Sequence, residues 1–136
     1  MQIMSRPIGE LVTDRVVDAL LPTTLRGAAR LLDEESVGAI LIADVRGTLG
    51  IFTERDLVRA VSEGEDVDQA RVAEHLTDQL VTVDASASVL EVIQQMHRNG
   101  IRHVVVNGPE GHAGVVSMRA VLDAIIAEVA APTPAP

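Results

Sequence analysis

The 136-residue sequence contains no cysteine, lysine, tryptophan or tyrosine, and it has a single phenylalanine. Without cysteine the chain has no disulfide, no thiolate nucleophile and no cysteine-ligated zinc site. No apolar run approaches the roughly 18 residues that would suggest a membrane-spanning helix, and the first ten residues lack the apolar stretch of a signal peptide. These absences favour a cytoplasmic protein without a membrane partner.

Lysine is absent, so all 11 basic residues are arginine, and the net charge is −9. An acidic chain without aromatic side chains on which bases can stack is unsuited to nucleic acid. A small anion remains a feasible ligand where several guanidinium groups converge, since arginine presents a planar fork suited to phosphate. Hydrophobic residues make up 47% of the chain, so we expect a core of Val, Ile, Leu and Ala.

The chain is an internal repeat, because an offset of 64 positions places residues 8–60 over residues 72–124 without a gap. Each copy contains an apolar stripe with the i, i+3, i+4, i+7 spacing of a half-buried helix. The stripes are Leu25, Ala28, Ala29 and Leu32, and then Val89, Val92, Ile93 and Met96. In the second copy the sequence SVLE (88–91) predicts a capping box that opens the helix.

Apolar runs follow both predicted helices, at residues 39–43 and 103–107, and have the β-branched content of buried strands. A turn, a second short strand and a final apolar helix come next in each copy, so each reads strand–helix–strand–strand–helix. We therefore predict an α+β fold in which two tandem repeats pack sheet to sheet with pseudo-twofold symmetry, because a unit of about 60 residues is marginal alone. The predicted organisation is repeat 1 at 8–62, a polar linker at 63–71, repeat 2 at 72–127 and a tail at 128–136 that is disordered at its Pro-rich end.

A short motif closes the third strand of each copy: GIFTERD at 50–56 and GVVSMRA at 114–120. Two copies ending in glycine-hydrophobic-x-[Thr/Ser]-x-x-Asp resemble the cystathionine β-synthase (CBS) domain pair, or Bateman module. GIRH at 100–103 matches the start of that family's central strand. The resemblance covers roughly residues 8–127, so it implies a stand-alone pair without a catalytic domain.

The resemblance to CBS pairs also implies a function. Such a module is a non-enzymatic regulator that binds AMP, ADP, ATP or S-adenosylmethionine between its repeats. It requires no cofactor, forms homodimers and signals to a separate effector protein. Which ligand is bound does not follow from the motif.

By the same resemblance, the ligand lies chiefly against the motif of repeat 1. Gly50 lets the backbone approach the ligand, Thr53 offers its hydroxyl, and Asp56 accepts hydrogen bonds from the ribose hydroxyls. No catalytic or metal-ligating residue is expected. The remaining expected ligand-binding residues are Ala39 and Ile40 near the adenine, with Arg55; further candidates are Arg102, His103, Ser117 and Arg119.

Thr53 and Asp56 have a second interpretation, because Thr-x-x-Asp is close to a helix capping box. In repeat 2 Ser117 keeps the cap, whereas Ala120 replaces the acid. The helix therefore does not need the carboxylate to begin, which favours a ligand role for Asp56 and predicts one competent nucleotide site per chain. The alternatives are a ligand-free structural or dimerisation module, in which Thr53 and Asp56 only cap a helix, and an enzyme that turns over an adenylate.

Overall fold

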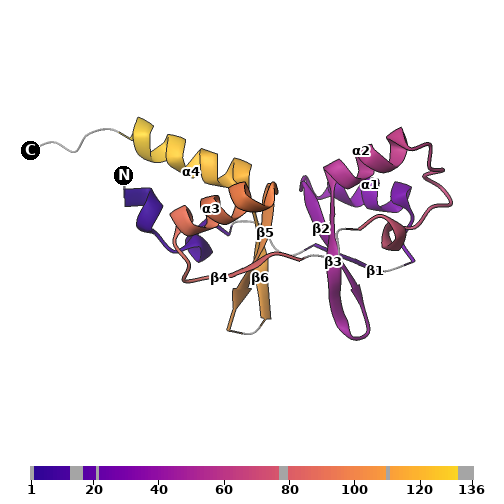
Figure 1. Ribbon diagram of the computed structural model, residues 1–136, viewed down its shortest axis with the longest axis horizontal. Coiled ribbons are helices and arrows are strands. Elements are labelled where there is room, and N and C mark those ends of the chain that lie inside the picture. Colours follow the sequence, from indigo (N-terminus) through magenta and orange to yellow (C-terminus); the bar gives the residue numbers. More distant parts are fainter. Residues whose placement is uncertain (1, 13–16, 21, 77–79, 110, 132–136) are drawn as a thin grey trace, which may run out of the picture. The chain divides into compact units, whose positions relative to one another are not determined.

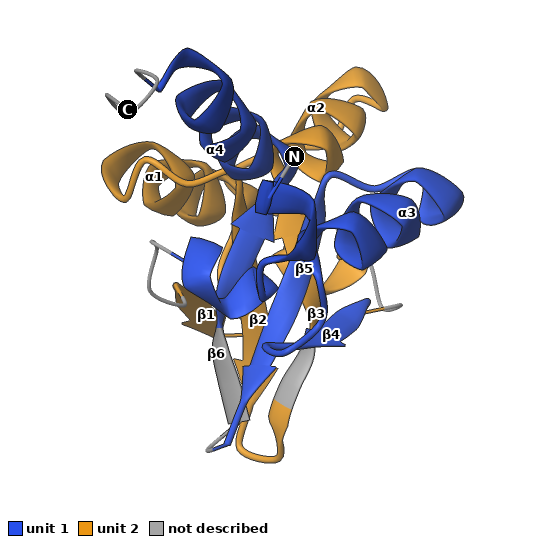
Figure 2. Ribbon diagram, turned by 90° about the vertical axis from the view of Figure 1, so that its left-hand side faces the viewer, with its two compact units in different colours: residues 1–15, 81–136 blue, residues 16–80 orange. Residues whose placement is uncertain are grey.

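The computed structural model describes residues 2–12, 17–20, 22–76, 80–109 and 111–131. Residues 13–16 and 77–79, which the repeat places opposite one another in part, and the predicted tail from residue 132 onward lie outside these ranges. The chain forms two compact units, residues 1–15 with 81–136 (unit 1) and residues 16–80 (unit 2), coloured blue and orange in Figure 2. The predicted packing of one sheet on the other stays a prediction, and each unit is described by itself.

Unit 2 contains a three-stranded mixed sheet in the order β1-β2-β3, in which β1 runs parallel to β2 and β3 runs antiparallel to it (Figure 1). The chain therefore forms the predicted strand–helix–strand–strand–helix order. Its elements are β1 (Asp18–Leu20), α1 (Leu25–Glu34), β2 (Ala39–Asp44), β3 (Gly47–Thr53), α2 (Glu54–Ser62) and the 3₁₀ helix η3 (Val72–Glu74).

Unit 1 repeats this arrangement with a sheet in the order β4-β5-β6, again with one parallel and one antiparallel pairing. Two short 3₁₀ helices from the N-terminal end of the chain belong to the same unit. Its elements are η1 (Gln2–Ser5), η2 (Ile8–Leu11), β4 (Thr82–Asp84), α3 (Val89–Asn99), β5 (His103–Gly108), β6 (Gly111–Ser117) and α4 (Met118–Ala130).

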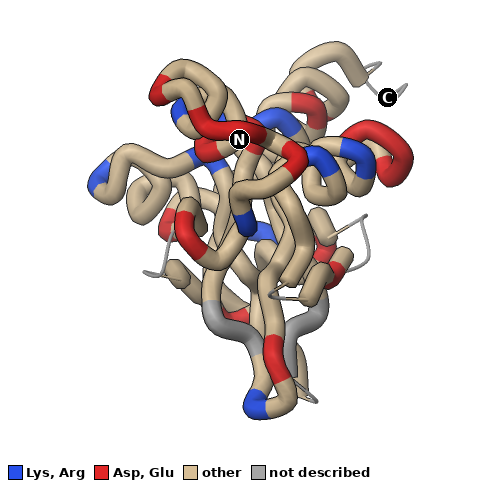
Figure 3. The backbone as a smooth tube through the Cα atoms, turned by 90° about the vertical axis from the view of Figure 1, so that its right-hand side faces the viewer, with Lys and Arg blue, Asp and Glu red and all other residues tan. Residues whose placement is uncertain are grey.

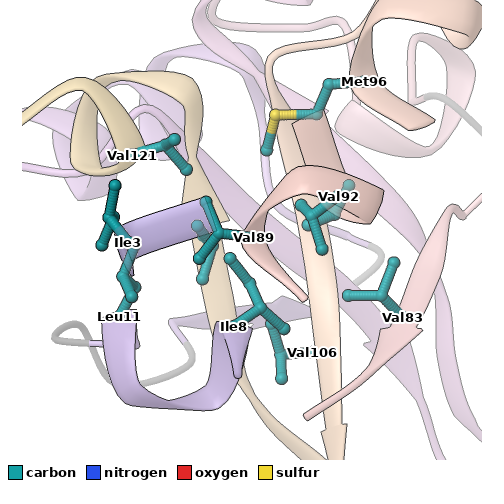
Figure 4. Packing of buried hydrophobic residues seen from close by; sticks show 11 residues of the cluster. Ile3, Ile8, Leu11, Val83, Val89, Val92, Met96, Val106 and Val121 are labelled. Atoms are coloured by element: carbon teal, nitrogen blue, oxygen red, sulfur yellow. The ribbon is translucent and has the colours of Figure 1, made fainter. Parts of the chain in front are cut away.

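The helical stripes predicted from the sequence face the two cores. In α1, Leu25, Ala28 and Leu32 are buried and Ala29 is partly buried. The stripe of α3 packs into the core of unit 1 with Ile3, Ile8 and Leu11 from the N-terminal segment (Figure 4). The predicted capping box at Ser88 and Glu91 is formed, with the Ser88 hydroxyl accepting from the Glu91 N–H at 3.1 Å.

The segment that precedes the first strand of each repeat packs with the other repeat. Backbone bonds join residues 6–9 to residues 85–89, including Ile8 N–H to the Ala87 carbonyl (2.7 Å) and Val89 N–H to the Arg6 carbonyl (2.9 Å). Sixty-four residues later the same pattern recurs in unit 2, where Val72 N–H donates to the Thr23 carbonyl at 3.0 Å. The start of the predicted repeat 1 thus packs with repeat 2, because its apolar residues and backbone groups complete that core.

Two segments at the predicted boundaries, residues 63–71 and 128–130, have defined structure. The polar linker at 63–71 packs on α1, where Ala70 is 8% exposed and the Arg26 N–H donates to the Val67 carbonyl at 2.9 Å. Helix α4 continues to Ala130, beyond the predicted tail boundary at residue 128, since strong helix formers continue up to Ala131 and a proline follows only at 132.

Charged residues lie mainly on the helices and turns, whereas the strands carry few of them (Figure 3). Several large apolar side chains of the last helix in each unit are also exposed. Val58 and Val61 on α2 are 68% and 54% exposed. Among the described residues, no helix is both long and apolar enough to cross a membrane.

Candidate functional site

The residues expected to bind a ligand in repeat 1 meet where β2 begins, β3 ends and α2 begins. Ala39 at the start of β2 is the cross-strand partner of Thr53, the last residue of β3, and Ile40 lies opposite Phe52. Gly50 pairs with Ile42 beside a register shift in the ladder. Antiparallel pairing therefore brings residues 39 and 53 together, although they are far apart in the sequence.

Thr53 and Asp56 form a reciprocal capping box at the start of α2. Asp56 Oδ2 accepts from the Thr53 backbone N–H at 2.9 Å and from the Thr53 hydroxyl at 3.1 Å. The Thr53 hydroxyl in turn accepts from the Asp56 N–H at 3.3 Å. The side chain of Asp56 is only 5% exposed, so its carboxylate is buried. The hydrogen bonds from Thr53 restrain its orientation.

The amides of Glu54 and Asp56 in the first turn of α2 have protein partners. Glu54 N–H donates to the Gly38 carbonyl at 3.1 Å, and the Asp56 N–H donates to Thr53 as described above. The start of α4 has the same arrangement, with Met118 N–H bonded to the Arg102 carbonyl at 2.8 Å. The helix start by itself is therefore a weaker anion site than free amides would make.

Arg59 was not identified as a site residue from the sequence. Its Nη1 atom lies 3.7 Å from Asp56 Oδ1, and the Arg59 side chain is 60% exposed. The available signal was the i, i+3 spacing from Asp56, which places the two side chains on neighbouring positions of one helix. Arg55, which was expected at the site, is exposed one helical turn before Arg59.

The counterpart in unit 1 keeps the backbone arrangement but lacks the acid. His103 at the start of β5 pairs with Ser117 at the end of β6, as Ala39 pairs with Thr53. The Ser117 hydroxyl accepts from the Ala120 N–H at 3.1 Å, so the helix begins with a cap but without a carboxylate. Arg102 and Arg119 are exposed near the same helix start.

The two groups of candidate residues belong to different compact units, residues 39–56 to unit 2 and residues 102–120 to unit 1. The contribution of Arg102, His103 and Arg119 to one shared ligand site therefore stays a prediction. Within the described ranges, no group of three or more His, Asp or Glu side chains could hold a metal ion.

The arrangement of two similar units, each with a capped helix following its last strand, defines the class of protein. The CBS domain family matches residues 2–63 and 72–127, and the chain belongs to this family. The resemblance noted in the sequence and the predicted pair of CBS repeats are thereby confirmed.

Similarity to individual proteins extends over most of the chain. A CBS-domain containing protein from Agrobacterium tumefaciens is 30% identical in its crystal structure, with a TM-score of 0.83, 93% of this chain covered and 98% of that one. A CBS domain protein from Pyrobaculum aerophilum, solved in complex with AMP, is 28% identical with a TM-score of 0.78, covering 93% and 99%.

Among curated relatives, the mitochondrial CBS domain-containing protein CBSX3 of Arabidopsis thaliana is 31% identical over 111 residues. The match covers 77% of this chain and 54% of that protein, so the chain spans about half of that relative's length.

Proposed function

We propose that this chain is a non-enzymatic regulatory module that binds an adenine nucleotide at residues 50–56 and signals its occupancy to a partner protein. Membership of the CBS family supports the proposal, as does the AMP complex of the Pyrobaculum aerophilum protein. The observation that carries it is the buried carboxylate of Asp56, at a helix start that the other repeat forms with Ala120. Because the other repeat starts its helix without this carboxylate, we assign Asp56 to ligand binding.

In this proposal, the ribose, the adenine and the phosphate each contact different residues where β2, β3 and α2 meet. Asp56 accepts hydrogen bonds from the ribose hydroxyls, because an ionised carboxylate has two acceptor oxygens and no donor. Backbone groups at Ala39 and Ile40 contact the adenine, and Gly50 allows close approach of the chain. Arg55 pairs with phosphate, and Arg102, His103, Ser117 and Arg119 are further candidates for ligand contacts.

AMP, ADP, ATP and S-adenosylmethionine are the candidate ligands, and AMP has the most direct support. Regulation follows from linkage: a ligand that prefers one arrangement of the two units shifts the population toward it by its differential affinity. The effector protein responds to that arrangement. No chemical step on the ligand is needed for this function.

Thermal unfolding with each candidate ligand tests the proposal, followed by a reporter dye because the chain lacks Trp and Tyr. Ligand at about 100 times its dissociation constant stabilises a protein by about 2.7 kcal/mol. We expect AMP to raise the melting temperature of the wild type and to leave Asp56→Ala unchanged. Asp56→Asn is the matched variant, because its amide oxygen can still accept from Thr53 while the charge is lost.

The second candidate function is a ligand-free structural module, and the complete capping box at Thr53 and Asp56 is the observation that favours it. In that case none of the four ligands changes the melting temperature. Asp56→Ala then lowers the free energy of unfolding by about 1 kcal/mol, the ordinary cost of a lost helix cap. A ligand-induced rise in the wild type would contradict this second function.

We also propose that the chain forms a homodimer through the exposed apolar faces of α2 and α4. Val58 and Val61 on α2, and Leu122, Ile126 and Val129 on α4, are each at least half exposed. A second copy offers the same faces, so the pairing is self-complementary. Sedimentation equilibrium should give a dimer for the wild type and a monomer for Ile126→Glu, and a monomeric wild type would contradict the proposal.

A further inference from the structure

We infer that Arg59 is a positioning residue of the nucleotide site, which holds the Asp56 carboxylate in the orientation that ribose requires. The inference rests on the proposed function, since it assigns a role within the same site. Asp56 Oδ2 is held by the N–H and the hydroxyl of Thr53. On the other side of the carboxylate, Oδ1 lies 3.7 Å from Arg59 Nη1.

These contacts act on both oxygens of one carboxylate. Thr53 holds Oδ2 through two hydrogen bonds. The guanidinium of Arg59 attracts Oδ1, so the contacts on the two oxygens together restrain rotation of the carboxylate about its bond to Cβ. It also compensates the negative charge of a side chain that is only 5% exposed, where an unpaired charge is unfavourable.

The helical positions of these residues suit this role. Successive residues of an α-helix are rotated by about 100°, so Arg59 projects between Arg55 and Asp56 on one arc of α2. Arg59 is one turn farther from the start of the helix than Arg55, and its side chain leans back toward that start. It therefore reaches Asp56 along the helix surface.

The second repeat offers an internal comparison. The positions equivalent to Asp56 and Arg59 are Ala120 and Asp123, each 64 residues later. Where the carboxylate is missing, the cation is also missing and an acid stands in its place. Asp123 is exposed on α4, so a cation is not required at this point of the helix surface for the fold. The arginine is present only in the repeat that has the carboxylate, as expected if Arg59 positions Asp56.

A purely structural role for Arg59 is the competing explanation. Arg59 lies in the last turn of α2, where a positive charge interacts favourably with the helix dipole. That role would affect the stability of the unliganded protein but not its affinity for nucleoside ligands. Ligand binding and stability therefore have to be measured on the same variants.

The experiment compares AMP and adenosine by isothermal titration calorimetry on the full chain. The variants are Arg59→Gln, Arg59→Lys and Arg46→Gln, the last being a matched loss of one exposed arginine at the turn between β2 and β3. We expect Arg59→Gln to weaken AMP and adenosine by the same factor, about tenfold, which corresponds to about 1.4 kcal/mol. Arg59→Lys should recover most of the affinity, and Arg46→Gln should bind as the wild type does.

Adenosine is the discriminating ligand because it has the ribose but no phosphate. A loss confined to AMP would mean that Arg59 binds the phosphate directly, which overturns the positioning role. Unchanged affinity for both ligands, with a lower melting temperature than Arg46→Gln, would assign Arg59 to helix stability alone. If the wild type binds neither ligand, the proposed function itself fails, and the inference fails with it.

Discussion

Glu128, near the end of α4, accepts through Oε1 a hydrogen bond of 2.8 Å from the backbone N–H of Ile3. The two residues are 125 positions apart in the sequence, and Ile3 is 1% exposed in the core of unit 1. A side chain of the last helix thus caps the first helical turn of the chain. The N-terminal segment is held by this bond as well as by its apolar contacts.

Replacement of Glu128 by alanine should lower the free energy of unfolding by about 1 kcal/mol, the typical net value of one hydrogen bond. The net stabilisation by Glu128 is limited, because its second oxygen, Oε2, is buried without a hydrogen-bond partner among the described residues. Urea denaturation measures the change. Asp123→Ala on the exposed side of the same helix is the control, and equal effects of the two substitutions would contradict the prediction.

Gly9→Ala should destabilise unit 1 by about 1–3 kcal/mol, as expected for an overpacked site. A Cβ atom at Gly9 would lie 3.0 Å from the Cβ and 3.1 Å from the carbonyl oxygen of Ala85. The double variant Gly9→Ala/Ala85→Gly should recover only part of the loss, since the carbonyl remains. Urea denaturation of the three proteins tests this, and a stabilised Gly9→Ala would show that the N-terminal segment is not packed as described.

The ion pair between Arg26 and Asp68 should make stability depend on pH in the acid range. Arg26 donates hydrogen bonds to both oxygens of Asp68, and this lowers the pKa of the Asp68 carboxyl below its usual value. Because the pKa of Asp68 is lower in the folded state, the charged carboxylate stabilises the folded protein at pH values above the unfolded-state pKa of about 3.9. That contribution is lost as the pH falls through the lower, folded-state pKa.

Urea denaturation of the wild type and Arg26→Gln at neutral pH and near pH 2 measures this contribution. We expect the variant to be the less stable protein at neutral pH and the difference to disappear in acid. Both side chains are about half exposed, so the difference is small and decreases with added salt. A difference that persists unchanged at the acid end would assign the effect of Arg26 to packing.

Ala120→Asp should complete a capping box in the second repeat. Ser117 already accepts from the residue-120 N–H, and an acid at this position can accept from the Ser117 N–H, as Asp56 does from Thr53. We expect the free energy of unfolding to rise by about 0.5 kcal/mol, the order of an acid placed in the first helical turn. If the proposed function is correct, calorimetric titration with AMP should also reveal a second site, whereas the wild type has one.

Most of the secondary structure was readable from the sequence because it is determined by local pattern. The stripe from Leu25 to Leu32 has helical spacing, and the run at 103–107 has the β-branched content of a buried strand. The capping boxes at Ser88 and Thr53 involve partners only three residues apart, so neither needed tertiary information. The repeat then related the second half of the chain to the first.

The tertiary structure alone decided which segments complete each core. The internal repeat assigned residues 8–11 to the copy that follows them, whereas the backbone N–H groups of Ile8 and Gly9 donate to residues 87 and 85 of the other repeat. The contacts of Glu128 with Ile3 and of Arg26 with Asp68 likewise join residues that no short window contains. The sequence by itself determined the local elements and their repetition, because these depend on spacing within a few residues. The pairing of distant segments depends on which backbone donors are still unpaired and which apolar surfaces are still exposed once those elements have formed. Only the folded chain decides that.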